Sequence, residues 1–368
     1  MADLVYRQDK TRRIIIDPEG TVGSVETLSG GAGVIIPALA STRVAPEDVE
    51  SISQSEALDG YAGEVASTRG AAGMGSTIAC EVRDYSPSGG GDAIAFPPWA
   101  KIALACGFEA AHTGGSKLLV FSPSTQPVSD WGGESAADSP PCSLTVADIM
   151  LDQSTSDDPD EAVFMRGATG SLKIMAKTND RLTVEGAFKG LVVANKFLDN
   201  DTTDDFSGYG TRATGESVDP LVVKGVTLTA EYRDTSDDSV TLYDLRDFEI
   251  DMGAVVERPF NPTATEGYGV AQPYHDTGPS VSFTIADTAA IAEDVMAGYY
   301  SGRGFFRIQL AWSLGVGSWT LNVPRIQYDA TRQAQGAGRA FAISGKAVRS
   351  YAGDSTAPVT ISYVYGTP

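Results

Sequence analysis

The sequence has few of the residues on which most catalytic and metal sites depend. It contains three cysteines and two histidines among 368 residues. Cys80, Cys106 and Cys142 stand at unrelated spacings without a Cys-x-x-Cys pair, a pattern that indicates neither a zinc site nor a disulfide framework. We therefore expect three buried free thiols and no cofactor.

The two histidines, His112 and His275, lie next to glycine or proline residues that are typical of loops. Neither accompanies a Gly-x-Ser-x-Gly nucleophile elbow, and only the neighbouring Asp276 could orient His275. We expect both histidines in surface loops and no enzymatic activity. A pair of carboxylates for glycoside hydrolysis leaves no sequence signature, so this one class of catalytic site stays open.

Long apolar runs and an excess of basic residues are also missing. No window reaches the ~18 apolar residues that a membrane-spanning helix requires, and the N-terminus shows no basic segment followed by an apolar one. Lys and Arg number 27 against 48 Asp and Glu, a formal charge of −21 that argues against a surface gripping nucleic acid. We expect a protein that is made in the cytosol and contacts no membrane.

What the sequence does contain favours a mainly β chain with many turns. Its 40 glycines, 19 prolines, 14 tyrosines and 13 phenylalanines are typical of strands joined by tight turns. Asn179 and Asp180 predict a hairpin turn. Strands are predicted at residues 118–121, a continuous apolar run, and where apolar and polar residues alternate, around residues 78–82, 144–146, 172–174, 182–188, 226–232, 248–252, 281–285, 306–310, 319–323 and 341–343.

Helix signals stand out against this background in residues 98–106. Pro98 suits the first helical position, and Gly107 suits the left-handed residue that closes a helix. An apolar stripe at helical spacing predicts one face docked on a sheet; its members are Trp99, Ile102, Ala103 and Cys106. A second helix is predicted over residues 287–299.

These elements divide the chain into five parts. We interpret residues 1–40 as an N-terminal arm, 41–198 as a first β-sandwich unit, 199–219 as a linker or exposed loop, 220–350 as a second unit and 351–368 as a C-terminal strand and tail. Each unit contains a strand, a short helix and two further strands in the same order. A tandem duplication of one unit is therefore expected.

Several stretches allow a binding role beside a structural one. Residues 70–75 are glycine-rich but lack the strand, helix and Lys-Ser/Thr of a phosphate-binding loop, so a close-packed hairpin is favoured. The acidic runs 152–161 and 199–205 lack the EF-hand register, so solvated loops are favoured over a weak calcium site. Inward positions of Trp99 and Trp319 favour core packing over a platform for stacking bases or sugars.

Six short segments, taken in order along residues 40–350, carry a family resemblance. They are Pro98-Trp99 through Ala105-Cys106-Gly107-Phe108, Cys142-Ser143-Leu144-Thr145-Val146, Met165-Arg166-Gly167-Ala168-Thr169-Gly170-Ser171-Leu172-Lys173, Phe188-Lys189-Gly190, Phe248 to Gly253 followed by Arg258, and Gly317 to Val323-Pro324-Arg325-Ile326-Gln327. Together they resemble the tail tube, or major tail, proteins of long-tailed bacteriophages. The residues that define the resemblance are Trp99, Cys106, Gly107, Phe108, Gly167, Gly170, Phe188, Gly253 and Pro324.

The resemblance implies a tail-tube-type β-sandwich or barrel with short flanking helices. Strands of neighbouring copies would close a β-barrel ring, and stacked rings would form the tube through which DNA leaves the virion. With two units per chain, a trimer would give the pseudo-sixfold ring that single-unit relatives reach with six copies. The implied partners are other copies of the chain and tail proteins of the tape-measure, terminator and distal-tail types, and the implied location is the virion tail.

The acidity agrees with such a tube, because a net-negative wall repels phosphates and lets DNA pass without binding. Long segments poor in core residues are the expected contacts within and between rings. These are the arm, with Arg12 and Arg13, and the acidic loops, with Asp157, Asp158, Asp201 and Asp204.

Three other functions stay open on the sequence. A different β-rich tail or baseplate component would form one ring and stop. A carbohydrate-binding or glycan-hydrolysing pair of β-sandwiches would use the acidic and aromatic residues. A secreted adhesin would need an export signal, which the N-terminus does not resemble.

Overall fold

The computed structural model describes most of the chain, and the described ranges are separated by gaps. These ranges are 12–26, 28, 33–39, 41–47, 51–52, 68–69, 73–85, 96–113, 118–132, 138–150, 161–177, 180–193, 209–212, 216–220, 227–233, 239–242, 245–261, 263, 268–275, 278–286, 305–314, 317–335, 338–348 and 357–364. They contain one α-helix and 25 strands, so the expected mainly β fold is confirmed.

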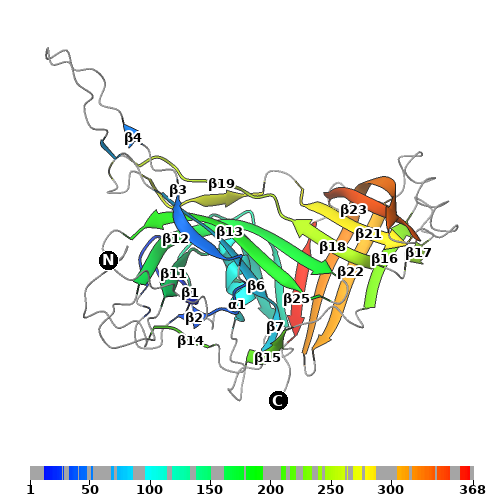
Figure 1. The fold of residues 1–368 in the computed structure, drawn as a ribbon, viewed down its shortest axis with the longest axis horizontal. Coiled ribbons are helices and arrows are strands. Elements are labelled where there is room, and N and C mark those ends of the chain that lie inside the picture. Colours follow the sequence, from blue (N-terminus) through cyan, green and yellow to red (C-terminus); the bar gives the residue numbers. More distant parts are fainter. Residues whose placement is uncertain are drawn as a thin grey trace, which may run out of the picture.

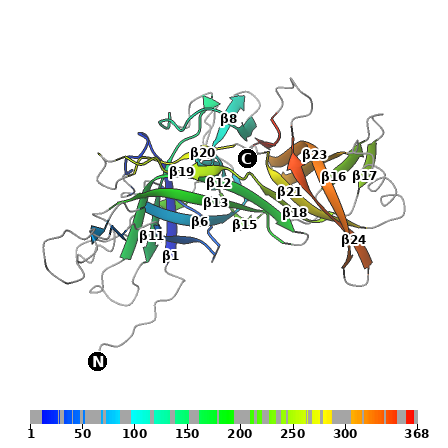
Figure 2. The ribbon, with the colours of Figure 1, turned by 90° about the horizontal axis from the view of Figure 1, so that it is seen from above.

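Eight antiparallel strands form one continuous sheet, which we call the front sheet. In order across the sheet they are β3 (Arg43–Glu47), β6 (Gly73–Glu81), β13 (Thr183–Val192), β12 (Glu161–Lys177), β18 (Leu245–Asp251), β21 (Ser280–Ala286), β24 (Gly338–Ala347) and β23 (Gly317–Gln335). Figure 1 shows β12 and β13 running across the molecule toward β18 and β21. Figure 2 shows the same strands from above, so that one sheet joins both halves of the chain.

A second group of strands, the back layer, covers one face of the front sheet. In order it contains β17 (Ser239–Leu242), β16 (Thr227–Arg233), β22 (Phe305–Leu314), the first half of β23, β25 (Thr360–Val364), β9 (Leu118–Pro123), β8 (Phe108–Thr113) and β10 (Asp138–Ser139). The rings of Phe283 in β21 and Phe306 in β22 have centroids 5.3 Å apart, so the two layers pack directly against each other.

The first part of β12 continues into a further ladder. It pairs with β11 (Leu144–Met150), which is followed by β1 (Arg12–Pro18), β2 (Val34–Ile35) and β14 (Thr211–Arg212). The expectation of an arm over residues 1–40 is wrong for β1, because Ile14, Ile15 and Ile16 are buried there. Burial of each such side chain contributes about 1.5–3 kcal/mol, which holds β1 inside the sheet.

Three two-stranded ribbons complete the strands. They are β4 (Ser51–Ile52) with β5 (Thr68–Arg69), β7 (Arg83–Tyr85) with β15 (Glu216–Pro220), and β19 (Val255–Glu257) with β20 (Gln272–Tyr274). Residues 199–219 therefore include paired segments, since β14 joins β2 and β15 joins β7.

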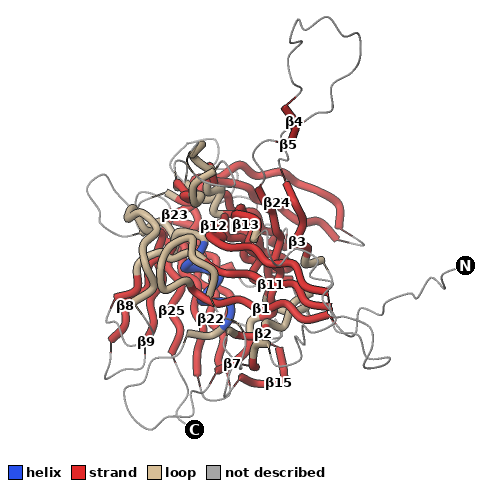
Figure 3. The backbone as a smooth tube through the Cα atoms, turned by 90° about the vertical axis from the view of Figure 1, so that its left-hand side faces the viewer, coloured by secondary structure: helices blue, strands red, loops and turns tan. Residues whose placement is uncertain are grey.

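The helix α1 (Pro98–Ala105) lies among the strands of both layers (Figure 3). It begins at Pro98, and Gly107 follows its end with φ +82°, both as predicted. The four residues of the expected apolar stripe are buried as predicted, but all eight helical residues are buried, so the helix does not have one apolar face alone. Trp99 contacts the back layer, whereas Ile102 lies against Gly186 of β13 in the front sheet, and both sides of the helix are thus covered.

Other expectations can be compared with the described residues. The hairpin between β12 and β13 is confirmed, and so are the three buried free thiols. Residues 78–82 are all buried, so the expectation of a half-buried strand there is wrong. The segment before β3 pairs with the edge of this strand: Leu39 donates its N–H to Ala79 O, and Thr42 Oγ1 accepts from Ala79 N. The second helix at 287–299 lies outside the described residues, and the duplication stays a prediction.

Candidate functional site

The uncovered face of the front sheet carries polar and charged side chains. Successive residues of a strand point to opposite faces, so each strand divides into an inner and an outer set. In β18, Phe248 and Ile250 are buried, whereas Asp247, Glu249 and Asp251 are partly exposed. The same division holds over residues 171–177 of β12 and along most of β21 and β24. The outer set therefore forms a polar surface that crosses both halves of the chain.

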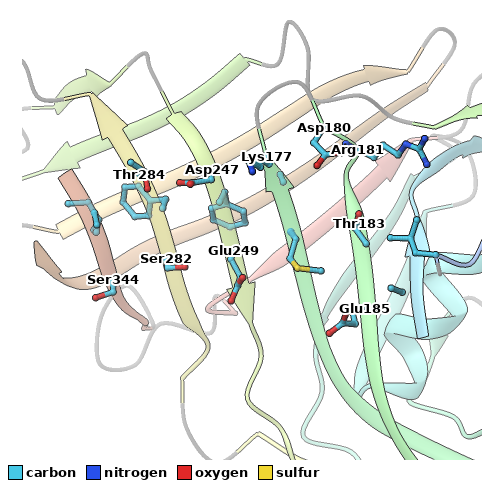
Figure 4. A pocket seen from close by; sticks show the side chains of 18 of the residues that line it. Lys177, Asp180, Arg181, Thr183, Glu185, Asp247, Glu249, Ser282, Thr284 and Ser344 are labelled. Carbon is cyan, nitrogen blue, oxygen red and sulfur yellow. Dashed lines mark hydrogen bonds between the residues drawn. The ribbon is translucent and has the colours of Figure 1, made fainter. Parts of the chain in front are cut away.

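This polar surface is hollowed to a volume of about 610 Å³ (Figure 4). Residues of β13, β12, β18, β21 and β24 line the hollow, among them Thr183, Met175, Glu249, Ser282 and Ser344. Figure 4 shows the side chains of Thr183, Glu249, Ser282 and Ser344 on different strands of the sheet. The hollow is thus an open depression of the sheet whose lining is both polar and apolar.

Opposite charges alternate across the surface. Lys173 Nζ lies 2.9 Å from Glu249 Oε1, and this hydrogen bond is the main cause that raises the pKa of Lys173. Glu185 and Asp251 raise it further. Such partly exposed pairs contribute little to stability, about 0–1 kcal/mol each.

A second ion-pair group lies at the hairpin end of the surface. Glu81, only 5% exposed, pairs with Arg181 across the β6–β13 ladder and with Arg83 Nη2 at 3.0 Å. Lys177 and Asp247 are cross-strand neighbours on the next pair of strands. Acids and bases are mixed on the described part of this face, with four acids (Asp180, Glu185, Asp247 and Glu249) against two bases (Lys177 and Arg181) lining the hollow, and the net-negative wall stays a prediction.

A buried carboxylate that no local sequence pattern predicts lies at the other end of the molecule. Glu19 is fully buried, and its two oxygens accept hydrogen bonds from Gly23 N (2.7 Å), Ser143 Oγ (2.5 Å), Thr145 Oγ1 (3.1 Å) and Gly167 N (2.6 Å). Burial raises the pKa of Glu19, and these hydrogen bonds oppose the rise. The group ties the end of β1 to β11 and to a bulge of β12.

The residues of the family resemblance serve packing and backbone geometry. Trp99, Cys106, Phe108 and Phe188 are at most 2% exposed. Gly107, Gly167 and Gly253 have positive φ, and a Cβ on Gly170 would lie 2.5 Å from Ala187 O. Pro324 lies in β23 where its pairing with β22 is irregular. These residues are spread over the fold and do not converge on one site.

The expected interface residues fall into two groups. Arg12 Nε donates to Asp148 Oδ1 at 2.7 Å, a second guanidinium bond reaches Oδ2, and Arg13 lies beside it in β1; both are strand residues and not part of an arm. The acidic residues Asp157, Asp158, Asp201 and Asp204 lie outside the described ranges.

The two histidines differ from the expectation of surface loops. His112 lies in β8 opposite Leu119. His275 is half-buried, with its ring edge-on to Phe108 at 6.2 Å, and burial lowers its pKa. It follows β20 and sits against Gly107 at the end of α1, so its place indicates a packing role.

Within the described ranges, no three or more His, Cys, Asp or Glu residues are grouped as a metal site would require. No helix in those ranges has the length and apolar character needed to span a bilayer. The sequence matches no protein-family model and no curated protein.

Proposed function

We propose that this chain is a structural subunit of a bacteriophage tail tube: copies join side by side into rings, and the rings stack into a hollow tube for DNA. The observation that carries the proposal is the front sheet. It is a continuous antiparallel sheet of eight strands, sealed on one face by α1 and the back layer; the other face is polar and partly exposed over residues 171–177 of β12 and along most of β18, β21 and β24.

A sheet of this form suits the wall of a water-filled channel. Its inner face is held by the buried core, whereas its outer face keeps charged side chains in solvent. A closed ring of such sheets would also remove the exposed edge strands that otherwise invite uncontrolled pairing. The polar surface would then face the lumen.

The mixed charges of the polar surface fit a channel that DNA crosses without being held. Duplex binding depends on clustered Lys and Arg that release counterions from phosphates. Lys173 and Arg181 are instead paired with Glu249 and Glu81. A phosphate would have to compete with a carboxylate for each of these cations.

The two tryptophans considered for the carbohydrate alternative do not support it. Trp99 and Trp319, at 1% and 0% exposed, are in the core and offer no face to a sugar. Self-assembly is therefore the proposed activity, with no enzymatic step. On this proposal the protein belongs to the virion tail, its trimers form pseudo-sixfold rings, and its further partners are tape-measure, terminator and distal-tail proteins.

The test is negative-stain electron microscopy of the purified chain over a range of protein and salt concentrations. Hollow tubes of constant diameter are expected. Isolated rings that never stack would favour a baseplate-type component. Discrete globules under all conditions would contradict the proposal.

A further inference from the structure

The front sheet contains the same order of pairings twice. In the N-terminal half the order is β3–β6–β13–β12, and in the C-terminal half it is β18–β21–β24–β23. The last strand of each set, β12 or β23, is long and also pairs with a strand outside the front sheet, β11 or β22. Strand for strand, β3 thus corresponds to β18 and β12 to β23.

Irregularities in the two long strands align them residue by residue. The β11–β12 ladder skips two residues between Met165 and Ala168, and the β22–β23 ladder skips two between Val323 and Ile326. When the skipped residues 166–167 of β12 are aligned with the skipped residues 324–325 of β23, residues 173–177 of β12 match residues 331–335 of β23. Both strands then end together, at Lys177 and at Gln335.

The neighbouring ladders carry this alignment across to β3. Ile174 lies opposite Val184, which lies opposite Cys80; Arg332 lies opposite Phe341, which lies opposite Ile285. Cys80 therefore corresponds to Ile285, and three residues earlier Thr77 corresponds to Ser282. Their partners on the next strand are Arg43 and Glu249. Position 43 of β3 thus matches position 249 of β18.

The junction between the halves, β12 with β18, is defined in register. Met175 lies opposite Glu249 and Lys173 opposite Asp251. Met252 N donates to Leu172 O at 2.9 Å, so Leu172 and Met252 form a hydrogen-bonded pair, as does every second pair of residues along the two strands. The pairs Met175–Glu249 and Lys173–Asp251 alternate with them as non-hydrogen-bonded pairs, whose Cα atoms lie closer.

The counterparts of this junction are the two ends of the front sheet. Among the described residues, β3 has a strand neighbour only in β6, and residues 331–335 have one only in β24. At one end of the sheet lies β3, which corresponds to β18. At the other end lie residues 331–335 of β23, which correspond to the residues of β12 that pair with β18. Eight antiparallel strands also leave β3 and β23 running in opposite directions, as an antiparallel junction requires.

We propose that β3 of one copy pairs with residues 331–335 of a second copy in the register of the β12–β18 junction, which places Arg43 opposite Gln333 and Ala45 opposite Thr331. This inference rests on the proposed assembly into rings and names the contact that closes them. The partner is a second copy of this chain, because the chain already contains a complete example of the contact.

The contact between copies is shorter than the junction within a chain. Pro46 takes the position of Met252 and has no N–H to donate. Thr42 already donates its N–H to Leu39 O at 3.0 Å. Of these residues, only Val44 can form a full hydrogen-bonded pair, in which its N–H donates to the C=O of residue 332 and its C=O accepts from the N–H of residue 332. Fewer hydrogen bonds make the contact weaker and its formation dependent on concentration.

Cysteine pairs test the register, and the three native cysteines are buried and give little background. The variants A45C/T331C and R43C/Q333C place thiols on non-hydrogen-bonded pairs, the spacing that a disulfide bridges. The matched positive control is M175C/E249C, the equivalent pair within the chain. The negative control A45C/Q335C is four residues out of register, about 13 Å. Each variant is assembled, oxidised and run on a non-reducing gel, and each sample is imaged.

Covalent ladders of two or more copies are expected from both in-register pairs, an intramolecular disulfide without ladders from M175C/E249C, and no ladder from A45C/Q335C. Tubes without ladders from either in-register pair, or ladders only from A45C/Q335C, would overturn the proposed contact and leave the tube standing. Absence of any assembly by the unsubstituted chain would overturn the proposed function itself.

Discussion

Trp99 of α1 and Tyr363 of β25 meet edge to face, with ring centroids 5.7 Å apart and planes at 85°. Tyr363 OH accepts a hydrogen bond from Tyr85 N of β7 and lies within donating distance of Asp84 Oδ1 and Tyr85 O of the same strand. The C-terminal strand is therefore fastened both to the helix and to β7. The same indole also contacts Phe121 and Trp319, so one side chain joins three strands of the back layer.

Replacement of Trp99 by alanine is expected to lower the free energy of unfolding by about 3–5 kcal/mol, because it leaves a large cavity in a well-packed core. Urea denaturation followed by circular dichroism measures the change. Trp131, which is partly exposed, is the control, and W131A is expected to cost clearly less. Equal losses from the two variants would contradict the central place of Trp99.

Gly107→Ala is expected to destabilise the chain by more than 1 kcal/mol, since residues other than glycine are strained at positive φ. The added Cβ would also lie 2.8 Å from His275 Nε2 and 3.2 Å from Pro273 Cγ. Gly253 is exposed and also has a positive φ, +58°. Gly253→Ala therefore serves as a comparison that adds backbone strain at an exposed site. Thermal unfolding should show the larger loss for Gly107→Ala, and a smaller one would refute the close contact with His275.

Glu19 predicts a pH dependence of stability. Because burial raises its pKa above 4.5, folding favours the protonated form, so its contribution is largest below pH 4.5 and falls as the pH rises through the folded pKa. Glu19→Gln cannot titrate and offers one acceptor oxygen to four donors, at a cost of about 1–3 kcal/mol. The difference in unfolding free energy between the two proteins should shrink from pH 4 to pH 7. If the difference in unfolding free energy instead grows with pH, folding lowers the pKa of Glu19 and the prediction is wrong.

Reversal of charge on the polar surface tests its place in the lumen. Asp247→Lys with Glu249→Lys creates a basic cluster beside Lys173 and Lys177, and assembled tubes of this variant are expected to retain fluorescent duplex DNA at low salt and release it as salt rises. The control, D130K/D138K, makes the same change of charge at exposed positions in the loop after β9 and in β10. Equal DNA retention by both variants would place the polar surface outside the lumen.

The thiols are expected to be silent in the folded chain. Burial raises the pKa of Cys142 to about 12, and Cys80 and Cys106 are equally inaccessible. A thiol reagent should therefore label no cysteine under native conditions and three per chain in denaturant. Rapid native labelling of any of them would contradict the packing around α1.

Local signals were sufficient for the helix and for most strands. Pro98 and Gly107 mark the ends of α1 by their backbone requirements alone, and these hold in any context. Alternation located β12 and β13 because one face of the front sheet is buried and the other is polar. The residues of the polar surface follow from the same alternation once the strand order is known.

The failures have a common physical cause, which is coverage by elements distant in sequence. Ile14 to Ile16 read as part of an arm because nothing local shows that β11 pairs with them. The stripe on α1 read as one-sided because only the fold places a second layer over the helix. Glu19 has no local signal because its four donors come from three separate segments. The packing of His275 is likewise invisible locally, because it depends on Gly107 and Phe108, which are distant in sequence.

The long strands β12 and β23 each belong to two groups of strands without a break in the chain. Sliding one layer over the other would therefore require stretching of covalent backbone, so each copy is stiff in shear. A filament built from such copies would bend at the joints between them, with every copy acting as a rigid link.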